Sequence, residues 1–164
     1  MIKDSGNRRT FEGGAVRDIQ EGKGRCDLLP LNEIAMLYRN DGAIKDVLKS
    51  IECFKRTGQV DYLIGALIVF KDVYENSIAD MILEVAKHYE EGANKYAERN
   101  WEKGIPTHCY IDSATRHLFK HLRGDTDERH DRAFVWNILG CMWTIKNKPE
   151  YNDYPIEEVK NNDN

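Results

Sequence analysis

The apolar residues of this chain recur at intervals of three and four, which is the spacing of one face of an α-helix. The clearest case runs from Ser77 to Ala97, where one stripe consists of Ile78, Met81, Ile82, Val85, Tyr89, Ala93 and Tyr96. Ser77 stands at an N-cap position, because a serine hydroxyl accepts a hydrogen bond from a free amide of the first turn. The pattern predicts a helix here and favours a helical fold.

Similar spacing predicts further helices on both sides. We expect them over Leu31–Tyr38, Ala43–Phe54, Asp61–Tyr74, a segment capped by Asp112 or Ser113 and ending at Gly124, and Asp127–Lys146. The continuous apolar run in 61–74 also suits a buried strand, but its length and its helical neighbours favour a helix. No period-two pattern is found elsewhere. The predicted fold class is therefore an all-α helical bundle.

A chain of 164 residues is long enough for one hydrophobic core and short for two. Residues 1–30 contain several glycines and little apolar periodicity, which predicts an extended arm. We expect a single all-α domain over 31–147. Residues 148–164 are rich in Asn, Asp and Glu, which predicts a loose polar tail unless Tyr151 and Tyr154 pin it to the body.

Composition narrows the functional classes. A formal net charge of −4 argues against a nucleic-acid binder that relies on overall basicity. The sequence has no apolar run near 18 residues and no basic-then-apolar start, so we expect neither a membrane span nor a secretory signal. Its four cysteines form no C-x-x-C pair, which disfavours a zinc or disulfide framework and suits a reducing cytoplasm.

Carboxylates stand beside the apolar stripe of the helix predicted over 77–97. At 100° per residue, Glu90 projects onto an alanine-containing flank, whereas Glu91 projects toward solvent. A poorly hydrated carboxylate is stabilised either by a metal ion or by a neighbouring lysine or arginine, and both alternatives stay open for Glu90. Gly92 falls on the apolar side, where we expect another helix to approach closely.

The last predicted helix carries a stripe of small and polar residues, which indicates close contact with a neighbour. Its members are His130, Ala133, Asn137, Gly140 and Thr144. Asn137 would either bind a ligand or be a satisfied core amide. Just upstream, Glu128 and Asp131 are three residues apart, so we expect both on one face, able to reach a single divalent ion. Asp127 and Glu128 would also complement the helix dipole, which is the alternative role.

Histidines and basic residues lie near these carboxylates. His117 and His121 have the i, i+4 spacing of a metal pair, but no zinc-protease carboxylate motif accompanies them, so exposed helical histidines are favoured. Asp112 and Arg116 have the spacing of a helical ion pair. The basic loop over 95–103 suits triphosphate oxygens, although such a charge run is usually a solvated face.

Six runs of residues together resemble the phage dATP/dGTP diphosphohydrolases. They are Thr10–Asp18, Gly22–Pro30, Tyr89–Tyr96, Arg99–Gly104, Asp112–His117 and Asp127–Asn137. The resemblance covers about residues 8–30 and 80–145, and 31–79 looks like inserted helices relative to shorter members. That family is similar to the MazG-like all-α NTP pyrophosphatases, which use Mg²⁺ or Mn²⁺ to split a nucleoside triphosphate into monophosphate and pyrophosphate.

The MazG-like signature is E-x-x-E followed by E-x-x-D. Glu128 and Asp131 match its second half. Its first half is missing, since Lys87 and Asn94 stand three residues from Glu90 and Glu91.

The resemblance implies roles for particular residues. The implied metal ligands are Glu90, Glu128, Asp131, Asp127 and His130, and the implied catalytic carboxylates are Glu90, Glu91 and Glu128. The implied substrate contacts are Lys23, Arg25, Lys95, Arg116, His117 and Asn137. The resemblance further implies a purine deoxynucleoside triphosphate as substrate and a homo-oligomer, dimer or tetramer, in the cytoplasm (the host's, if phage-encoded). Two alternatives remain: a non-catalytic nucleotide-binding decoy or sensor, and a helical protein that binds a host partner.

Overall fold

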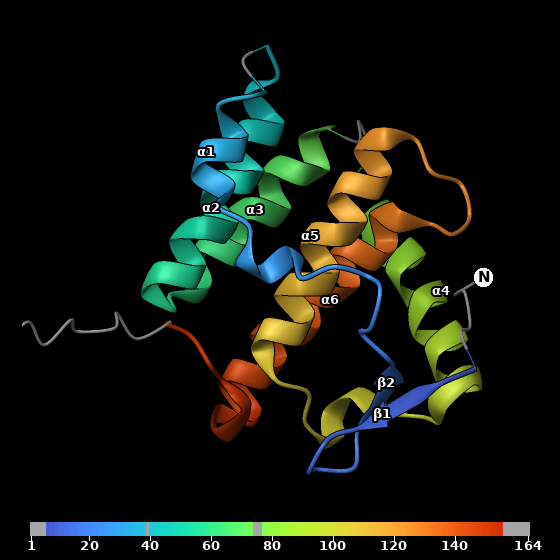
Figure 1. The fold of residues 1–164 in the computed structure, drawn as a ribbon. Coiled ribbons are helices and arrows are strands. Elements are labelled where there is room, and N and C mark those ends of the chain that lie inside the picture. The colour runs from blue at the N-terminus through green and yellow to red at the C-terminus, as the bar shows by residue number, and fades with distance from the viewer. Residues whose placement is uncertain (1–5, 39, 74–76, 156–164) are drawn as a thin grey trace, which may run out of the picture.

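The structure is a computed structural model, and it describes residues 6–38, 40–73 and 77–155 (Figure 1). The helices are α1 (Leu31–Ala35), α2 (Gly42–Thr57), α3 (Val60–Val73), α4 (Ile78–Tyr96), α5 (Thr107–Arg123) and α6 (His130–Asn147). Short 3₁₀ turns are η1 (Cys26–Leu28), η2 (Asn100–Lys103) and η3 (Pro149–Tyr151), and strands β1 (Arg8–Thr10) and β2 (Val16–Asp18) pair antiparallel. The prediction of an all-α bundle is confirmed, with one small sheet added. Residues 1–5 of the predicted arm, Tyr74, and 156–164 of the predicted tail lie outside the described residues.

The helix predicted at Ser77 has the expected start. The Ser77 hydroxyl accepts a hydrogen bond from the Asp80 amide, and the Asp80 carboxylate accepts one from the Ser77 amide, which completes a capping box. The helix predicted to begin at Asp112 or Ser113 begins instead at Thr107, with both residues buried inside it. The capping prediction was wrong because the helix starts five residues earlier than Asp112. Its first turn is capped there by Asp153, a residue distant in the sequence, which accepts a hydrogen bond from the His108 amide.

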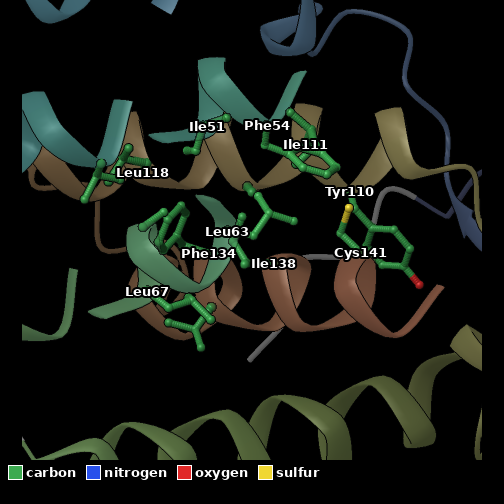
Figure 2. Packing of buried hydrophobic residues seen from close by; sticks show 14 of the residues in the cluster. Ile51, Phe54, Leu63, Leu67, Tyr110, Ile111, Leu118, Phe134, Ile138 and Cys141 are labelled. Atoms are coloured by element: carbon green, nitrogen blue, oxygen red, sulfur yellow. The ribbon is translucent and has the colours of Figure 1, made fainter. Parts of the chain in front are cut away.

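One core cluster contains buried side chains from all six of the described helices. Figure 2 shows the labelled side chains of this cluster, which come from α2 (Ile51, Phe54), α3 (Leu63, Leu67), α5 (Tyr110, Ile111, Leu118) and α6 (Phe134, Ile138, Cys141). Helix α5 packs along α6, α2 packs along α3, and α4 packs on α6. The segment predicted as inserted helices therefore contributes to the same core as the rest of the bundle. Within the described residues, no helix is both long and apolar enough to cross a membrane.

The close approach predicted for the small-residue stripe of α6 is confirmed at Gly140. A Cβ atom placed on Gly140 would lie 2.5 Å from Cε1 of Tyr110 in α5. The same expectation for Gly92 was wrong, because no atom lies within 4 Å of a Cβ there. Gly92 borders an open cavity instead of a neighbouring helix.

Residues 6–30 are more structured than the predicted extended arm. In the β1–β2 hairpin Arg9 is paired with Arg17, and the Asn100 side chain bonds both the amide and the carbonyl of Val16 at 2.9 Å. The hairpin lies against one end of α4 (Figure 1). Strands of three residues are too short to display an alternating pattern, so the sequence did not predict them.

The described part of the C-terminal segment is held to α2 and α5. The Tyr154 ring lies 5.1 Å from the Phe54 ring, and the Asp153 carboxylate accepts a hydrogen bond of 2.9 Å from the His108 amide. Asp153 also pairs with the His108 imidazole. This distant carboxylate supplies the cap that α5 lacks locally, and the tyrosine contact agrees with the pinned alternative for the tail.

Replacing Gly140 with alanine should destabilise the fold. The added methyl group would overlap the Tyr110 ring, and overpacking of this kind costs about 1–3 kcal/mol, only partly offset by the better helix propensity of alanine. Gly92→Ala is the matched control and should be neutral or slightly stabilising. Urea denaturation followed by circular dichroism measures both. Equal effects of the two variants would contradict the close contact.

The His108–Asp153 pair should make stability depend on pH at the alkaline end. Its hydrogen bond to Asp153 raises the pKa of His108 to about 10, above the ordinary 6.5. A raised pKa contributes stability that is complete below about pH 6.5 and is lost as the pH approaches 10. We therefore expect the difference in unfolding free energy between the wild type and Asp153→Asn to shrink from pH 6 to pH 10. A constant difference would contradict a charged pair.

Candidate active site

A cavity of about 940 Å³ lies between the N-terminal hairpin, α4, η2 and the neighbouring parts of α5 and α6. Its volume is at the upper end of the range for small-molecule sites. Four aromatic residues line it, namely Tyr89, Tyr96, Trp101 and Trp136. Its basic residues are Arg9, Arg17, Lys23, Arg99, Arg116 and Lys120, and its acidic residues are Asp18, Glu90, Glu98 and Glu128. The cavity thus combines apolar ring surface with an excess of basic groups.

Arg17 of β2 is held at the cavity wall by neutral acceptors. Its guanidinium donates to the Cys109 carbonyl (3.3 Å), the Ser113 hydroxyl (3.1 Å) and the Asn137 side-chain oxygen (2.9 Å). It also lies over the Trp136 ring at 5.7 Å. Among the described residues no carboxylate pairs with Arg17, and burial lowers its pKa. A cation in this setting keeps capacity to bind an anion.

Arg9 faces Arg17 across the hairpin and lines the same cavity. Its Nε atom is buried and has no hydrogen-bond partner in the described part of the chain. Like charges directly opposite each other in a sheet are destabilising. The hairpin therefore carries an electrostatic cost that a bound anion would remove. Neither arginine was predicted from the sequence as a site residue, although Arg17 lies in the run Thr10–Asp18 that carries the family resemblance and Arg9 directly precedes it.

Asp18 gathers several cations at the edge of the cavity. Its carboxylate pairs with Arg8 (3.1 Å), Lys95 (3.2 Å) and Lys23 (3.8 Å) and accepts a hydrogen bond from the Tyr96 hydroxyl (3.0 Å). Lys95, predicted to contact substrate, is thus bound to Asp18 and is not among the residues that line the cavity. Lys23 does line it, and burial lowers the pKa of its ammonium group.

Asp112 fastens the chain after the hairpin to α5. Its side chain is fully buried and accepts hydrogen bonds from the Cys26 amide (2.6 Å), the Gln20 side chain (2.7 Å) and Arg116 (2.7 Å). Arg116 donates in addition to the Gly24 carbonyl at 3.2 Å. The predicted Asp112–Arg116 ion pair is present, and Arg116 lines the cavity as expected of a substrate contact.

Arg25, also predicted as a substrate contact, points elsewhere. It forms a bidentate pair with Asp27, half of its side chain is exposed, and it is absent from the cavity wall. The neighbouring carboxylate, two residues away, holds it outside the site.

The two carboxylates of α4, Glu90 and Glu91, have environments that differ from the prediction. Glu90 is exposed on the cavity wall and makes no hydrogen bond or ion pair within the described residues. Glu91 was expected in solvent, but it packs toward α6, where Arg132 donates to it at 2.7 Å. Burial opposes its ionisation, yet the Arg132 bond outweighs that and lowers the pKa of Glu91. The reason is that α4 packs on α6 through the side that carries His88 and Glu91.

Glu128 and Asp131 do not share a face, contrary to prediction. Helix α6 begins at His130, so Glu128 precedes it and the helical spacing between the two residues does not apply. Glu128 lines the cavity, whereas Asp131 is held by Arg129 (2.6 Å) and borders a separate small hollow. The expectation that one ion bridges both carboxylates was therefore wrong. Glu90 likewise belongs to no group of three or more metal-ligating side chains among the described residues.

Two histidines meet Glu128 beside the cavity: His117 and Glu128 line it, and His130 is buried next to them. His117 Nδ1 lies 3.0 Å from His130 Nδ1, and Glu128 Oε1 lies 3.5 Å and 3.6 Å from these two nitrogens. On the other side of the His130 ring, Nε2 contacts Asp127 Oδ1 at 2.8 Å. Burial, followed by the proximity of His130, holds the pKa of His117 well below its usual value. Among the described residues, His117, Glu128 and the buried His130 form a group whose donor atoms could hold one metal ion.

The His117–His121 pair suggested by spacing is not a joint ligand set. His121 packs with its ring centre 6.1 Å from that of Phe70, away from the cavity. The observed partner of His117 comes from α6 because α5 and α6 are packed neighbours joined by a short turn. The sequence signal that could have predicted this contact is a histidine in each of two consecutive helices joined by a short turn, namely His117 and His130.

Asn137 has the hydrogen bonds expected of a satisfied core amide, which is one of the two alternatives left open for it. Its amide nitrogen donates to the Ala133 carbonyl at 2.8 Å, as a core amide would, and its oxygen accepts from Arg17. It is buried and also lines the cavity.

A comparison with protein families supplies one match. Residues 68–154 match the family model described as dATP/dGTP diphosphohydrolase, N-terminal. Neither a curated protein nor a solved structure matches the chain.

Loss of the Asp112 carboxylate should free the segment that closes the cavity. Asp112→Ala leaves Arg116 and the Cys26 amide without their acceptor, and breaking a buried pair in this way costs about 3–5 kcal/mol. We expect faster tryptic cleavage at Lys23 and Arg25 and a lower unfolding free energy. The control is Asp125→Ala, which removes the exposed pair with Arg123 and should change little. Unchanged cleavage in Asp112→Ala would contradict the anchor.

Proposed function

The chain belongs to the dATP/dGTP diphosphohydrolase N-terminal family, and from this membership we propose that it hydrolyses a purine deoxynucleoside triphosphate to the monophosphate and pyrophosphate, with a divalent metal ion. One observation carries the proposal beyond the family. Two arginines without a carboxylate partner line the same cavity as a histidine–carboxylate cluster, in the part of the chain that the structure describes.

The phosphates would bind at the basic wall of the cavity. Arg9 and Arg17 are partly buried, face each other across the hairpin and have unsatisfied charge. Charge-assisted hydrogen bonds to phosphate oxygens would offset both the desolvation and the repulsion between them. Lys23 and Arg116 also line the cavity, paired with Asp18 and Asp112 respectively, and would extend the clamp along the triphosphate.

The purine would lie against the aromatic wall. The rings of Trp101 and Tyr89 are 5.5 Å apart, and those of Tyr89 and Trp136 are 5.9 Å apart, so they form a continuous edge-to-face series. Such a surface offers dispersion contacts to a flat base while Asn137 and Asn100 supply polar groups nearby. The larger purine ring covers more of this surface than a pyrimidine does.

The chemistry needs a water nucleophile and an acceptor for its proton. A divalent ion at His117, Glu128 and His130 would neutralise phosphate charge and make a bound water more acidic. Attack by water on the α-phosphorus forms one P–O bond and breaks the bond to the oxygen bridging the α and β phosphates, so that pyrophosphate leaves. Glu90 would take the proton, because it lies on the wall and no described ion pair holds it. Glu91, tied to Arg132, is not assigned this role.

The direct test is a panel of the four deoxynucleoside triphosphates with separate divalent ions. We expect equimolar monophosphate and pyrophosphate from dATP or dGTP, and little from the pyrimidines. A rise in melting temperature with nucleotide but no turnover would contradict the enzyme and support a nucleotide-binding decoy. Neither turnover nor shift would favour a helical interaction protein. Light scattering of the same sample tests the proposed homo-oligomer.

Arg9 should contribute to nucleotide affinity and not to folding. Arg9→Gln removes a charge-assisted contact worth about 1.5–3 kcal/mol, which corresponds to a loss of about 10-fold or more in affinity. Stability without ligand should be unchanged or higher, because the repulsion with Arg17 is gone. Arg123→Gln makes the same charge change outside the cavity and serves as control. Calorimetric titration with a non-hydrolysable dATP analogue measures both variants, and equal affinities would contradict the clamp.

A further inference from the structure

We propose that His117, His130 and Glu128 form a three-ligand site for a borderline transition-metal ion of the Zn²⁺ class, in preference to Mg²⁺. The resemblance noted in the sequence implied Mg²⁺ or Mn²⁺ held by carboxylates. The three residues brought together here, of which His117 and Glu128 line the cavity, instead offer two imidazole nitrogens and a single carboxylate oxygen. The identity of the ion rests on these donors, and only its catalytic use rests on the proposed function.

The separations of the three donor atoms suit a tetrahedral ion. They are 3.0 Å between the two Nδ1 atoms and 3.5 Å and 3.6 Å from these to Glu128 Oε1. Zn²⁺ binds nitrogen and oxygen at about 2.0–2.2 Å, and tetrahedral angles then place neighbouring donors about 3.3–3.5 Å apart. Because His117 and Glu128 line the open cavity, an ion held by the three ligands keeps a coordination position for water or substrate, as in catalytic zinc sites.

A second, independent observation is the carboxylate behind His130. Asp127 Oδ1 lies 2.8 Å from Nε2, on the side of the ring away from His117. When Nε2–H donates to this carboxylate, Nδ1 carries a lone pair directed toward His117 and Glu128. Carboxylate–histidine–metal arrangements of this kind orient the ligand and raise its basicity. The ring is buried, with 1% of its side chain exposed, so its orientation is fixed by these neighbours.

The same donor set disfavours Mg²⁺. That ion requires oxygen ligands in near-octahedral geometry and is bound mostly through carboxylates, waters and phosphates. Of the other carboxylates predicted as its ligands, Asp131 is paired with Arg129 beside a different hollow, and Glu90 is outside the cluster. Imidazole nitrogen is a common ligand for Zn²⁺ and neighbouring transition ions.

A competing group consists of Asp125, Asp127 and His130, whose donor atoms also lie close together. Both oxygens of Asp125 are already bonded to Arg123, and Asp127 is paired with Lys120 at 3.3 Å. An ion there would have to displace two cations, Arg123 and Lys120. The cavity-side group has no such competition, because Glu128 is paired only with the two histidines among the described residues.

Binding of the ions themselves provides the test. The chelator-treated protein is titrated with Zn²⁺, Co²⁺ and Mg²⁺ by calorimetry, and the Co²⁺ complex is examined by visible absorption. We expect one Zn²⁺ or Co²⁺ per chain, the strong absorption of four-coordinate Co²⁺, and affinity for Mg²⁺ weaker by about 100-fold or more. Equal or tighter binding of Mg²⁺, or six-coordinate Co²⁺ absorption, would overturn the proposal.

Variants then locate the ion. His130→Gln and Glu128→Gln should abolish the Co²⁺ absorption, and Asp127→Asn should weaken binding by about 10–100-fold. His121→Gln is the matched histidine control and should bind normally. Loss of binding in Asp125→Asn together with normal binding in Glu128→Gln would assign the ion to the competing group. Circular dichroism and melting temperatures of each variant separate lost ligands from lost folding, and Glu128, which precedes α6, is the least disruptive position.

Failure of the site and failure of the proposed function give different results. Stoichiometric Zn²⁺ binding without nucleotide turnover overturns the hydrolase and leaves the metal site intact. Nucleotide turnover with Mg²⁺ in a protein that binds neither Zn²⁺ nor Co²⁺ overturns the metal site and leaves the hydrolase intact.

Discussion

The buried carboxylate of Asp112 is the interaction on which the cavity depends. It sits fully enclosed in the middle of α5 and accepts hydrogen bonds from a backbone amide, a glutamine and an arginine. Those three donors belong to the segment after the hairpin and to the next turn of α5. A buried charge must be compensated, so the segment is forced to lie along α5. The hairpin is thereby held over α4 and η2, and the cavity acquires the wall that carries Arg9 and Arg17.

Electrostatics divides that cavity into two regions. The hairpin contributes guanidinium groups whose acceptors are neutral, while the junction of α5 and α6 contributes two imidazoles and a carboxylate. Aromatic rings of α4, η2 and α6 lie on the wall of the same cavity. Cationic groups that can bind an anion, donor atoms that can bind a metal ion and aromatic rings that can pack against a flat apolar group thus occur around one cavity. This combination is what the proposal of nucleotide hydrolysis draws on.

The helices could be predicted from local sequence patterns, whereas the site could be predicted from them only in part. Ser77, the apolar stripe after it and the end of α5 at Gly124 could be predicted, because caps and periodicity act within a few residues. The start of α5 could not, since its cap is Asp153. Glu128 and Asp131 were placed on one face by assuming that both lie in a helix. The helix begins between them, three residues later than predicted, and the two carboxylates therefore border different hollows.

The sequence by itself determined that the chain would form a helical bundle and that its acidic, histidine and basic residues would cluster near α4, α5 and α6, because periodicity and composition are local properties. Only the tertiary structure decided which of those residues meet. His117 contacts His130 because α5 and α6 pack as neighbours. The packing of α4 on α6 places Glu91 against Arg132, so that Glu91 forms an ion pair there. The register of the two short strands places Arg9 opposite Arg17. Each pairing joins residues distant in sequence and depends on the packing of whole elements, which no local pattern encodes.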